Sequence, residues 1–235
     1  MKKTRIELEE MSYAVTEELK TLRTNILFCG TEKQVIMVTS SVMGEGKSTT
    51  AARLAASLAE LEKNVLLLDL DLRKSVLPSR LHATGVEQGM SHFLSGQCGL
   101  ADMIMVTNIP RLHVAFAGPY APNPTELISS NRFRTMIAYL RKSYDYIILD
   151  VPPLGMVVDA AIIAKESDGA ILVLQSGQIK RHLAREVKNK IEETGCPVLG
   201  AVLTRMNKQE MGRYYSKYYG KYYGKYYGNE EKKKA

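Results

Sequence analysis

The chain has 235 residues, 45% of them hydrophobic, and a formal net charge of +7 at pH 7. That length and apolar content predict one packed α/β domain with a short appendage, and they argue against a wholly disordered chain. No apolar run approaches the roughly 18 residues of a membrane-spanning helix, and the charged segment 1–10 lacks a signal-peptide stretch, so we expect a cytoplasmic protein.

The spacing of the cysteines and the distribution of charge argue against a metal centre and against a nucleic-acid-binding domain. Cys29, Cys98 and Cys196 show no metal-ligand spacing, which favours reduced thiols over a metal centre or catalysis. From residue 207 onward, eight Lys/Arg residues against three Glu residues give a charge of 8 − 3 = +5. The remainder is close to neutral, which argues against a nucleic-acid-binding face on the domain.

Strand-like and helix-like segments alternate through most of the chain. In chain order we predict helix 17–28, strand 34–39, helix 47–61, strand 65–68, strand 112–116, helix 131–142, strand 146–149, helix 159–165, strand 170–174, helix 181–193 and strand 198–203. This alternation predicts a mainly parallel sheet with helices on both faces. Because ligands of such sheets bind at the carboxyl ends of the strands, we expect segments 40–48, 69–73, 150–153 and 204–207 to line one crevice.

A phosphate-binding loop is predicted between the first strand and the helix that follows it. Residues 41–48 read Ser-Val-Met-Gly-Glu-Gly-Lys-Ser, and a strand before such a loop and a helix after it are the required setting. Ser41 stands where the usual pattern has glycine, but the rest of the pattern rarely arises by chance. A P-loop NTPase-like fold and ATP binding follow, with backbone N–H groups and the helix N-terminus holding phosphate. The residues expected to bind ATP are Met43, Gly44, Glu45, Gly46, Lys47, Ser48 and Thr49.

Carboxylates follow two of the predicted strands. Asp69 and Asp71 end the segment Leu66-Leu67-Leu68-Asp69-Leu70-Asp71, so both side chains share a face if the extended conformation continues. Asp150 ends a second apolar strand. A Mg·ATP site needs acids for the metal and one to accept a hydroxyl proton, and three clustered acids can fill both roles.

The end of the chain repeats a four-residue unit. Between residues 214 and 229 two tyrosines are followed by Gly or Ser and then by Lys, or by Asn in the last unit. With frequent glycine and no aliphatic residue, this segment cannot bury enough apolar surface to offset its ordering entropy, so we predict a disordered Tyr-rich tail over 207–235. Eight of the thirteen tyrosines lie here: Tyr214, Tyr215, Tyr218, Tyr219, Tyr222, Tyr223, Tyr226 and Tyr227.

Together these segments resemble bacterial tyrosine kinases, the cytoplasmic kinases of capsule and exopolysaccharide systems. Segments 17–30, 89–96 and 118–130 are also similar to parts of the Gram-positive capsule kinase. The resemblance implies a P-loop tyrosine kinase domain over 1–206, with an oligomerisation helix within 1–30, and an autophosphorylation tail over 207–235. The motifs that carry it are the phosphate loop, Asp69-x-Asp71-x-Arg73 and Asp150-x-Pro152-Pro153.

The resemblance also implies roles for individual residues. Lys47 would bind phosphate, and Mg²⁺ would be held by Ser48, Asp71 and Asp150. Asp69 would take the proton of the tyrosine hydroxyl, although Asp71 is an alternative base.

Two further residue assignments are less defined by the family pattern. Arg73 would either stabilise the charge that develops on the transferring group or form a structural salt bridge. After the last strand, either Arg205 or Asn207 would contact the adenine base.

Partners are implied by the same resemblance. Family members form rings through a Glu-x-x-Arg-x-x-Arg helix, and the corresponding residues here are Glu17, Lys20 and Arg23. Lysine lacks the planar fork of arginine, so a solvated helix face remains an alternative. The resemblance further implies a membrane co-polymerase whose cytoplasmic tail activates the kinase and recruits it to the inner face of the membrane, and a cognate tyrosine phosphatase.

Two rival functions remain open from the sequence. Partitioning or cell-division ATPases share this fold, but they carry a second lysine at the position of Val42. Alternatively, paired aromatics alternating with lysine could stack on single-stranded nucleic acid, although the nearly neutral body does not support that function.

Overall fold

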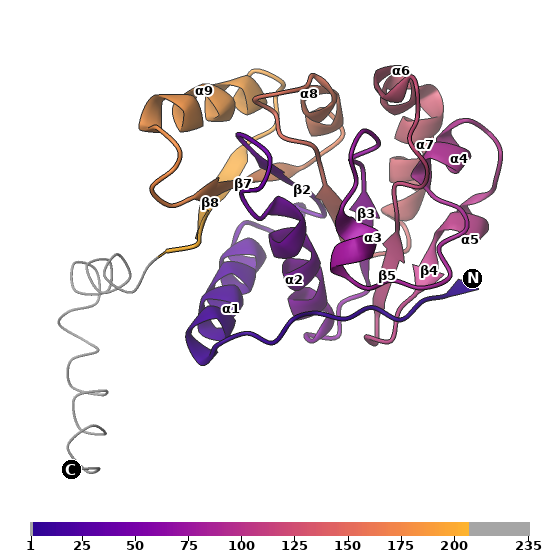
Figure 1. Ribbon diagram of the computed structural model, residues 1–235, viewed down its shortest axis with the longest axis horizontal. Coiled ribbons are helices and arrows are strands. Elements are labelled where there is room, and N and C mark those ends of the chain that lie inside the picture. The colour runs from indigo at the N-terminus through magenta and orange to yellow at the C-terminus, as the bar shows by residue number, and fades with distance from the viewer. Residues whose placement is uncertain (1, 207–235) are drawn as a thin grey trace, which may run out of the picture.

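The computed structural model describes residues 2–206 and shows one eight-stranded sheet with helices on both faces (Figure 1). All neighbouring strands are parallel except β4 and β5, so the predicted mainly parallel sheet is confirmed. Across the sheet the strands run β1 (Lys2–Lys3), β4 (Met105–Val106), β5 (Leu112–Ala115), β3 (Val65–Asp69), β6 (Tyr146–Asp150), β2 (Val35–Ser40), β7 (Gly169–Gln175) and β8 (Val198–Thr204).

Two hydrophobic cores lie on opposite faces of the sheet. Successive strand residues point to opposite faces, so Ile36 packs in one core and Met37 in the other. One face is covered by α1 (Tyr13–Phe28), α2 (Lys47–Ala59) and α3 (Leu77–Arg80). The other is covered by α4 (Met90–Leu94), α5 (Leu100–Met103), α6 (Pro124–Ser129), α7 (Asn131–Leu140), α8 (Asp159–Ala164) and α9 (Arg181–Glu192).

The predicted elements are all present, with ends shifted by a few residues. The prediction missed β1, β4 and the four helices α3 to α6, which have two to six residues each. Elements this short do not complete enough periods for a hydrophobic pattern to reveal them. None of the helices within residues 2–206 is long and apolar enough to cross a membrane.

Strand order brings the predicted site segments together. The central order β3-β6-β2-β7 places the ends of β3 and β6 beside the loop that follows β2. Asp69 and Asp150 are direct neighbours in the β3–β6 register, and Val38 pairs with Asp150 across β2–β6. The carboxyl edge of the sheet therefore gathers the acids next to the loop.

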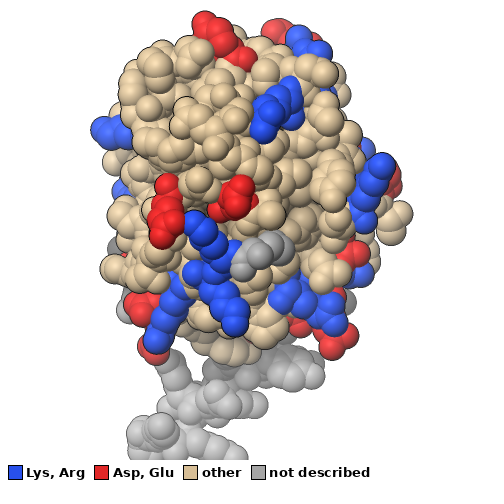
Figure 2. Space-filling view, turned by 90° about the vertical axis from the view of Figure 1, so that its right-hand side faces the viewer, with Lys and Arg blue, Asp and Glu red and all other residues tan. Residues whose placement is uncertain are grey.

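The surface at the β1–β4 edge of the sheet carries both signs of charge. Figure 2 shows lysine and arginine side chains there interspersed with acidic ones and separated by uncharged surface. Lys2 and Glu87, for example, form an ion pair of 2.5 Å. Subtracting the +5 of residues 207–235 from the total of +7 leaves +2 for residues 1–206.

Candidate active site

The loop between β2 and α2 has the backbone conformation that a phosphate-binding site requires. Gly44 and Gly46 adopt φ values of +85° and +95°, a left-handed conformation that L side chains rarely adopt. α2 then begins at Lys47, directly after Gly46. The predicted strand–loop–helix setting is therefore confirmed, and the N-terminus of a thirteen-residue helix faces the loop.

Lys47 lies among the predicted acids. Its Nζ is 3.2 Å from Asp150 Oδ1 and 3.3 Å from Asp71 Oδ2. Burial opposes the charged form, but Asp150 and Asp71 outweigh it and raise the pKa of Lys47, so the side chain is a cation. The expected clustering of the loop lysine with acids from two strands is confirmed.

Asp69 is the most deeply buried of the three acids. It has no exposed surface, and the hydroxyl of Ser75 donates a hydrogen bond to its Oδ2. Burial, reinforced by the charge of Asp150, raises the pKa of Asp69 to about 7. Asp69 is thus a carboxyl group that exchanges a proton near neutral pH.

The extended conformation does not continue to Asp71. β3 ends at Asp69, and a turn covers residues 72–74. The cause is local: the Asp69 carboxylate accepts a hydrogen bond of 3.2 Å from the Asp71 backbone N–H, and Asp71 Oδ1 accepts one of 3.0 Å from Lys74 N. This turn brings Asp71 to Lys47.

The oxygens around Lys47 fit a Mg²⁺ ion carried by a nucleotide. Ser48 Oγ, Asp71 Oδ2 and Asp150 Oδ1 all lie within 3.3 Å of the same ammonium nitrogen. Mg²⁺ prefers such hard oxygen ligands and is usually bound by one or two carboxylates together with substrate phosphates. Within residues 2–206, no group of three or more His, Cys, Asp or Glu residues is placed to hold a metal without such a partner.

Comparison with known proteins identifies the family. Residues 33–194 match the AAA domain family. Over 194 residues the chain is 46% identical to the tyrosine-protein kinase CpsD of Streptococcus agalactiae, covering 82% of this chain and 84% of that protein. The chain belongs to the bacterial tyrosine kinase family.

Solved structures agree with this membership. The chimerical protein CapA2B2 superposes on the kinase with a TM-score of 0.81 at 32% identity, over 88% of this chain and 95% of that one. The septum site-determining protein MinD of Pyrococcus horikoshii, complexed with Mg-ADP, has a TM-score of 0.63 at 26% identity, over 72% and 69% of the two chains. The likeness to the cell-division ATPase is one of fold.

Glu45 of the kinase has a function that the sequence did not reveal. Its side chain is buried, with the residue only 1% exposed. Oε2 accepts hydrogen bonds from the backbone N–H groups of Ser41 and Val42 at 2.7 and 2.8 Å, and Oε1 accepts one from Gln175 N at 3.0 Å. One carboxylate therefore fixes the start of the phosphate loop to β7, and any contact of Glu45 with ATP is left to its backbone.

We expect Glu45→Ala to weaken nucleotide binding. Three inward N–H groups lose their acceptor, at about 1–3 kcal/mol for each that stays unpaired, so the loop loses its fixed shape. A loss of about 1.4–2.8 kcal/mol in binding raises the Kd of a non-hydrolysable ATP analogue roughly 10- to 100-fold in titration calorimetry. Glu60→Ala, at a side chain that is 67% exposed, is the matched control. An unchanged Kd for Glu45→Ala would contradict this assignment.

The end of β8 also contacts the phosphate loop of the kinase. Thr204 Oγ1 donates a hydrogen bond of 2.7 Å to the carbonyl oxygen of Glu45. Arg205 adopts φ +53° and donates from Nη1 to Gln175 Oε1 at 3.0 Å. The expected proximity of segment 204–207 to the phosphate loop is confirmed for Thr204, whereas contact with adenine stays a prediction and Asn207 lies outside the described residues.

The predicted oligomerisation residues lie together on α1. Lys20 pairs with Glu17 at 2.8 Å, one helical turn away. Arg23 Nη1 donates to the carbonyl oxygen and Oγ of Ser57 at 2.8 and 3.1 Å, and its side chain is only 13% exposed. Arg23 thus fastens α1 to α2 within one chain, and its function in a ring stays a prediction. The eight tail tyrosines lie outside the described residues.

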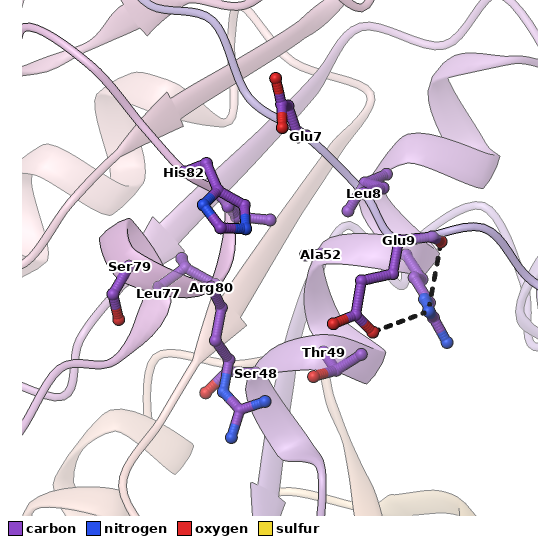
Figure 3. Close-up of a pocket in the computed structure, with 12 residues that line it drawn as sticks. Glu7, Leu8, Glu9, Ser48, Thr49, Ala52, Leu77, Ser79, Arg80 and His82 are labelled. Carbon is purple, nitrogen blue, oxygen red and sulfur yellow. Dashed lines mark hydrogen bonds and ion pairs between the residues drawn. The ribbon is translucent and has the colours of Figure 1, made fainter.

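A cavity of about 250 Å³ opens beside the first turns of α2 (Figure 3). Leu77 and Leu81 give it an apolar wall, and Figure 3 shows the Arg80 side chain extending toward Ser48. Pockets for small molecules usually measure roughly 300–1,000 Å³, so this cavity suits one side chain better than a nucleotide. Of the phosphate loop, only Ser48 and Thr49 contribute to its lining.

Sequence reasoning missed two further polar residues of the site. Arg73 forms an ion pair with Asp159, at 2.6 Å between Nε and Oδ2, and Thr125 bonds to both. The structural salt bridge expected as one of two alternatives for Arg73 is therefore present. Asp159 is 86 positions away in sequence and opens a predicted helix, where an acid is unremarkable, so no local signal could have found it.

Proposed function

We propose that this protein-tyrosine kinase transfers the γ-phosphoryl group of ATP to tyrosines of residues 207–235 in a neighbouring copy of itself. The supporting observation is the position of Lys47 between Asp71 and Asp150, beside a buried Asp69 whose pKa is about 7. Residues 1–206 act as the kinase domain and residues 207–235 as the acceptor. The proposed cellular role is control of capsular or exopolysaccharide synthesis and export.

Binding of the nucleotide follows from the loop. Backbone N–H groups of segment 43–49 and the N-terminus of α2 hold the phosphates, and Lys47 neutralises them. Ser48, Asp71 and Asp150 hold the Mg²⁺, with Arg205 or Asn207 beside the base. Bound Mg²⁺ supplies positive charge for the phosphate oxygens.

Proton transfer is assigned to Asp69. A tyrosine hydroxyl has a pKa of about 10 and is a weak nucleophile at neutral pH, so its attack requires a base. The phenol oxygen forms a bond to the γ-phosphorus while the bond from phosphorus to the ADP oxygen breaks. The phenol proton passes to Asp69, and the products are phosphotyrosine and ADP.

The tail suits this site through its charge and its tyrosines. Residues 207–235 carry eight tyrosines and a charge of +5, and the site holds three aspartates. Tethering in an oligomer supplies the hydroxyl at high effective concentration, which lowers the entropic part of the barrier. Glu17, Lys20 and Arg23 are the proposed interface of that oligomer.

Other partners are proposed on family resemblance. They are a membrane co-polymerase whose cytoplasmic tail activates the kinase and recruits it to the inner face of the membrane, and a tyrosine phosphatase that reverses the reaction. Nucleic acid is not among them, because residues 1–206 have a net charge of only +2.

A mixing experiment tests transfer between copies. Lys47→Met in the full chain serves only as acceptor, and a wild-type chain lacking residues 208–235, which keeps Asn207, serves only as donor. With Mg·ATP we expect phosphotyrosine on the Lys47→Met chain in the mixture and on neither protein alone. If full-length wild type labels itself while the mixture stays unlabelled, transfer between copies is wrong.

We predict that heavy phosphorylation releases the tail and loosens the assembly. Each phosphate adds about −1.5 to −2 charge, so eight add about −12 to −16, and a tail of +5 becomes one of roughly −7 to −11. The three aspartates then repel the tail. Sedimentation velocity should show smaller species for the phosphorylated protein than for a chain with all eight tail tyrosines changed to phenylalanine, and identical profiles would disprove the idea.

A further inference from the structure

The side chain of Arg73 is held on one edge only. Asp159 is 1% exposed and accepts hydrogen bonds from Nε at 2.6 Å and from Nη2 at 3.1 Å. Thr125 Oγ1 accepts a bond of 2.9 Å from Nη2 and donates one of 2.7 Å to Asp159 Oδ1. A two-point contact between guanidinium and carboxylate fixes the orientation of the plane as well as its position.

Among the described residues, the opposite edge of the guanidinium has no hydrogen-bond partner. Nε and Nη2 form the side that faces Asp159, so the two N–H groups of Nη1 are left, and Nη1 makes no hydrogen bond to any residue in 2–206. Because the Arg73 side chain is 37% exposed, these donors remain accessible to a ligand. Asp159 and Thr125 therefore form a clamp that uses Nε–H and both N–H groups of Nη2, and it leaves only the two N–H groups of Nη1.

The clamp joins the two segments that carry the catalytic acids. Arg73 lies two residues after Asp71, in the turn that brings Asp71 within 3.3 Å of Lys47 Nζ. Asp159 opens α8, which follows the segment after Asp150. An ion pair between them ties the β3 turn to the β6 segment across the crevice.

We propose that Asp159, supported by Thr125, is a positioning residue that presents Nη1 of Arg73 to an oxygen of the transferring phosphoryl group. This inference rests on the proposed phosphotransfer. Arg73 touches the reacting group, and Asp159 acts through Arg73. A donor fixed in advance costs no reorganisation when negative charge develops, and removal of one such donor typically lowers kcat by about 10²–10³-fold.

The test compares two Arg–Asp ion pairs. Asp159→Asn keeps the shape of the side chain and removes its charge, and we expect kcat to fall roughly 10- to 100-fold with the KM for ATP within about twofold. Asp168→Asn is the matched control, because Asp168 accepts bonds of 2.7 and 2.9 Å from Arg141 and lies next to the amino ends of β2 and β7. It should lower the melting temperature and leave kcat unchanged.

Three further tests keep the inference open to refutation. If Asp159→Asn does not fold, Thr125→Val removes one support of the clamp and should lower kcat to a smaller extent. Affinity for ADP with aluminium fluoride, which mimics the transferring group, should fall in either variant while affinity for ADP alone is retained. Arg73→Ala should make the Asp159→Asn change nearly silent.

The outcomes separate this inference from the proposed function. If wild type binds ADP with aluminium fluoride but forms no phosphotyrosine, the proposed acceptor is wrong and the positioning role survives. If Asp159→Asn loses no more kcat and no more affinity for the mimic than Asp168→Asn, or if its effect multiplies with that of Arg73→Ala, the positioning role is wrong.

Discussion

Replacing Lys47 with methionine is expected to abolish phosphotyrosine formation and to destabilise the unliganded protein. Without the ammonium, the phosphate loop loses its cation and the buried carboxylates of Asp71 and Asp150 lose their nearest positive charge, at 3.3 and 3.2 Å. Removal of one partner of a buried ion pair typically costs about 3–5 kcal/mol. Denaturant unfolding should show a loss of that order, and labelled ATP should give at least a roughly 10³-fold lower rate.

The pH dependence of the stability loss in Lys47→Met tests the assignment of the ion pairs. Burial already raises the pKa of Asp150, and Lys47 is the main group that opposes this. Without Lys47 the pKa of Asp150 rises further, so the destabilisation should be larger at pH 8 than at pH 6. Lys142→Met, at an exposed lysine after α7, should change neither rate nor stability. A Lys47→Met protein as stable as wild type at pH 8 would contradict the ion-pair assignment.

The Asp69→Asn substitution is expected to remove the base. Because Asp69 must be charged to accept the phenol proton and its pKa is about 7, kcat/KM of the wild type should rise with pH through neutrality. The rate of the variant should be about 10²–10⁴-fold lower than that of the wild type. Its kcat/KM should also no longer rise with pH near pH 7. If this rise survives in Asp69→Asn and disappears in Asp71→Asn, Asp71 is the base.

Stability of the wild type should depend on the same proton. The pKa of Asp69 is about 7 in the folded protein and near 3.9 in an unfolded chain, so folding favours its protonated form. That contribution is fully present below about pH 4 and is lost as pH rises through about 7. Asp69→Asn should therefore flatten the decline in unfolding free energy between pH 5 and 8, while Asp145→Asn, at an exposed acid, should leave it unchanged.

The central architecture could be predicted from the sequence because its strands are continuous apolar runs. Segments such as Ile147-Ile148-Leu149 are buried on both faces of a parallel sheet, and the alternation with helices leaves few alternative topologies. The carboxyl-end rule then predicted that Lys47, Asp69 and Asp150 lie at one edge of the sheet, and the structure confirms that they are neighbours there.

The direction of the Glu45 side chain and the ion pair between Arg73 and Asp159 could not be predicted from the sequence. Glu45 lies within a phosphate-loop motif, yet its carboxylate points inward to Ser41, Val42 and Gln175, and spacing carries no information on such a direction. The partner of Arg73 lies on another helix, 86 positions away, and only the folded chain brings the two together.

Mapping phosphate on the full chain by mass spectrometry after incubation with Mg·ATP, with and without the cytoplasmic tail of the proposed membrane activator, tests the central claim most directly. We predict phosphate on tyrosines between residues 214 and 227 in the wild type, and none in Lys47→Met. ATP that fails to bind, or that binds while every tyrosine stays unmodified even beside the activator, would contradict the account.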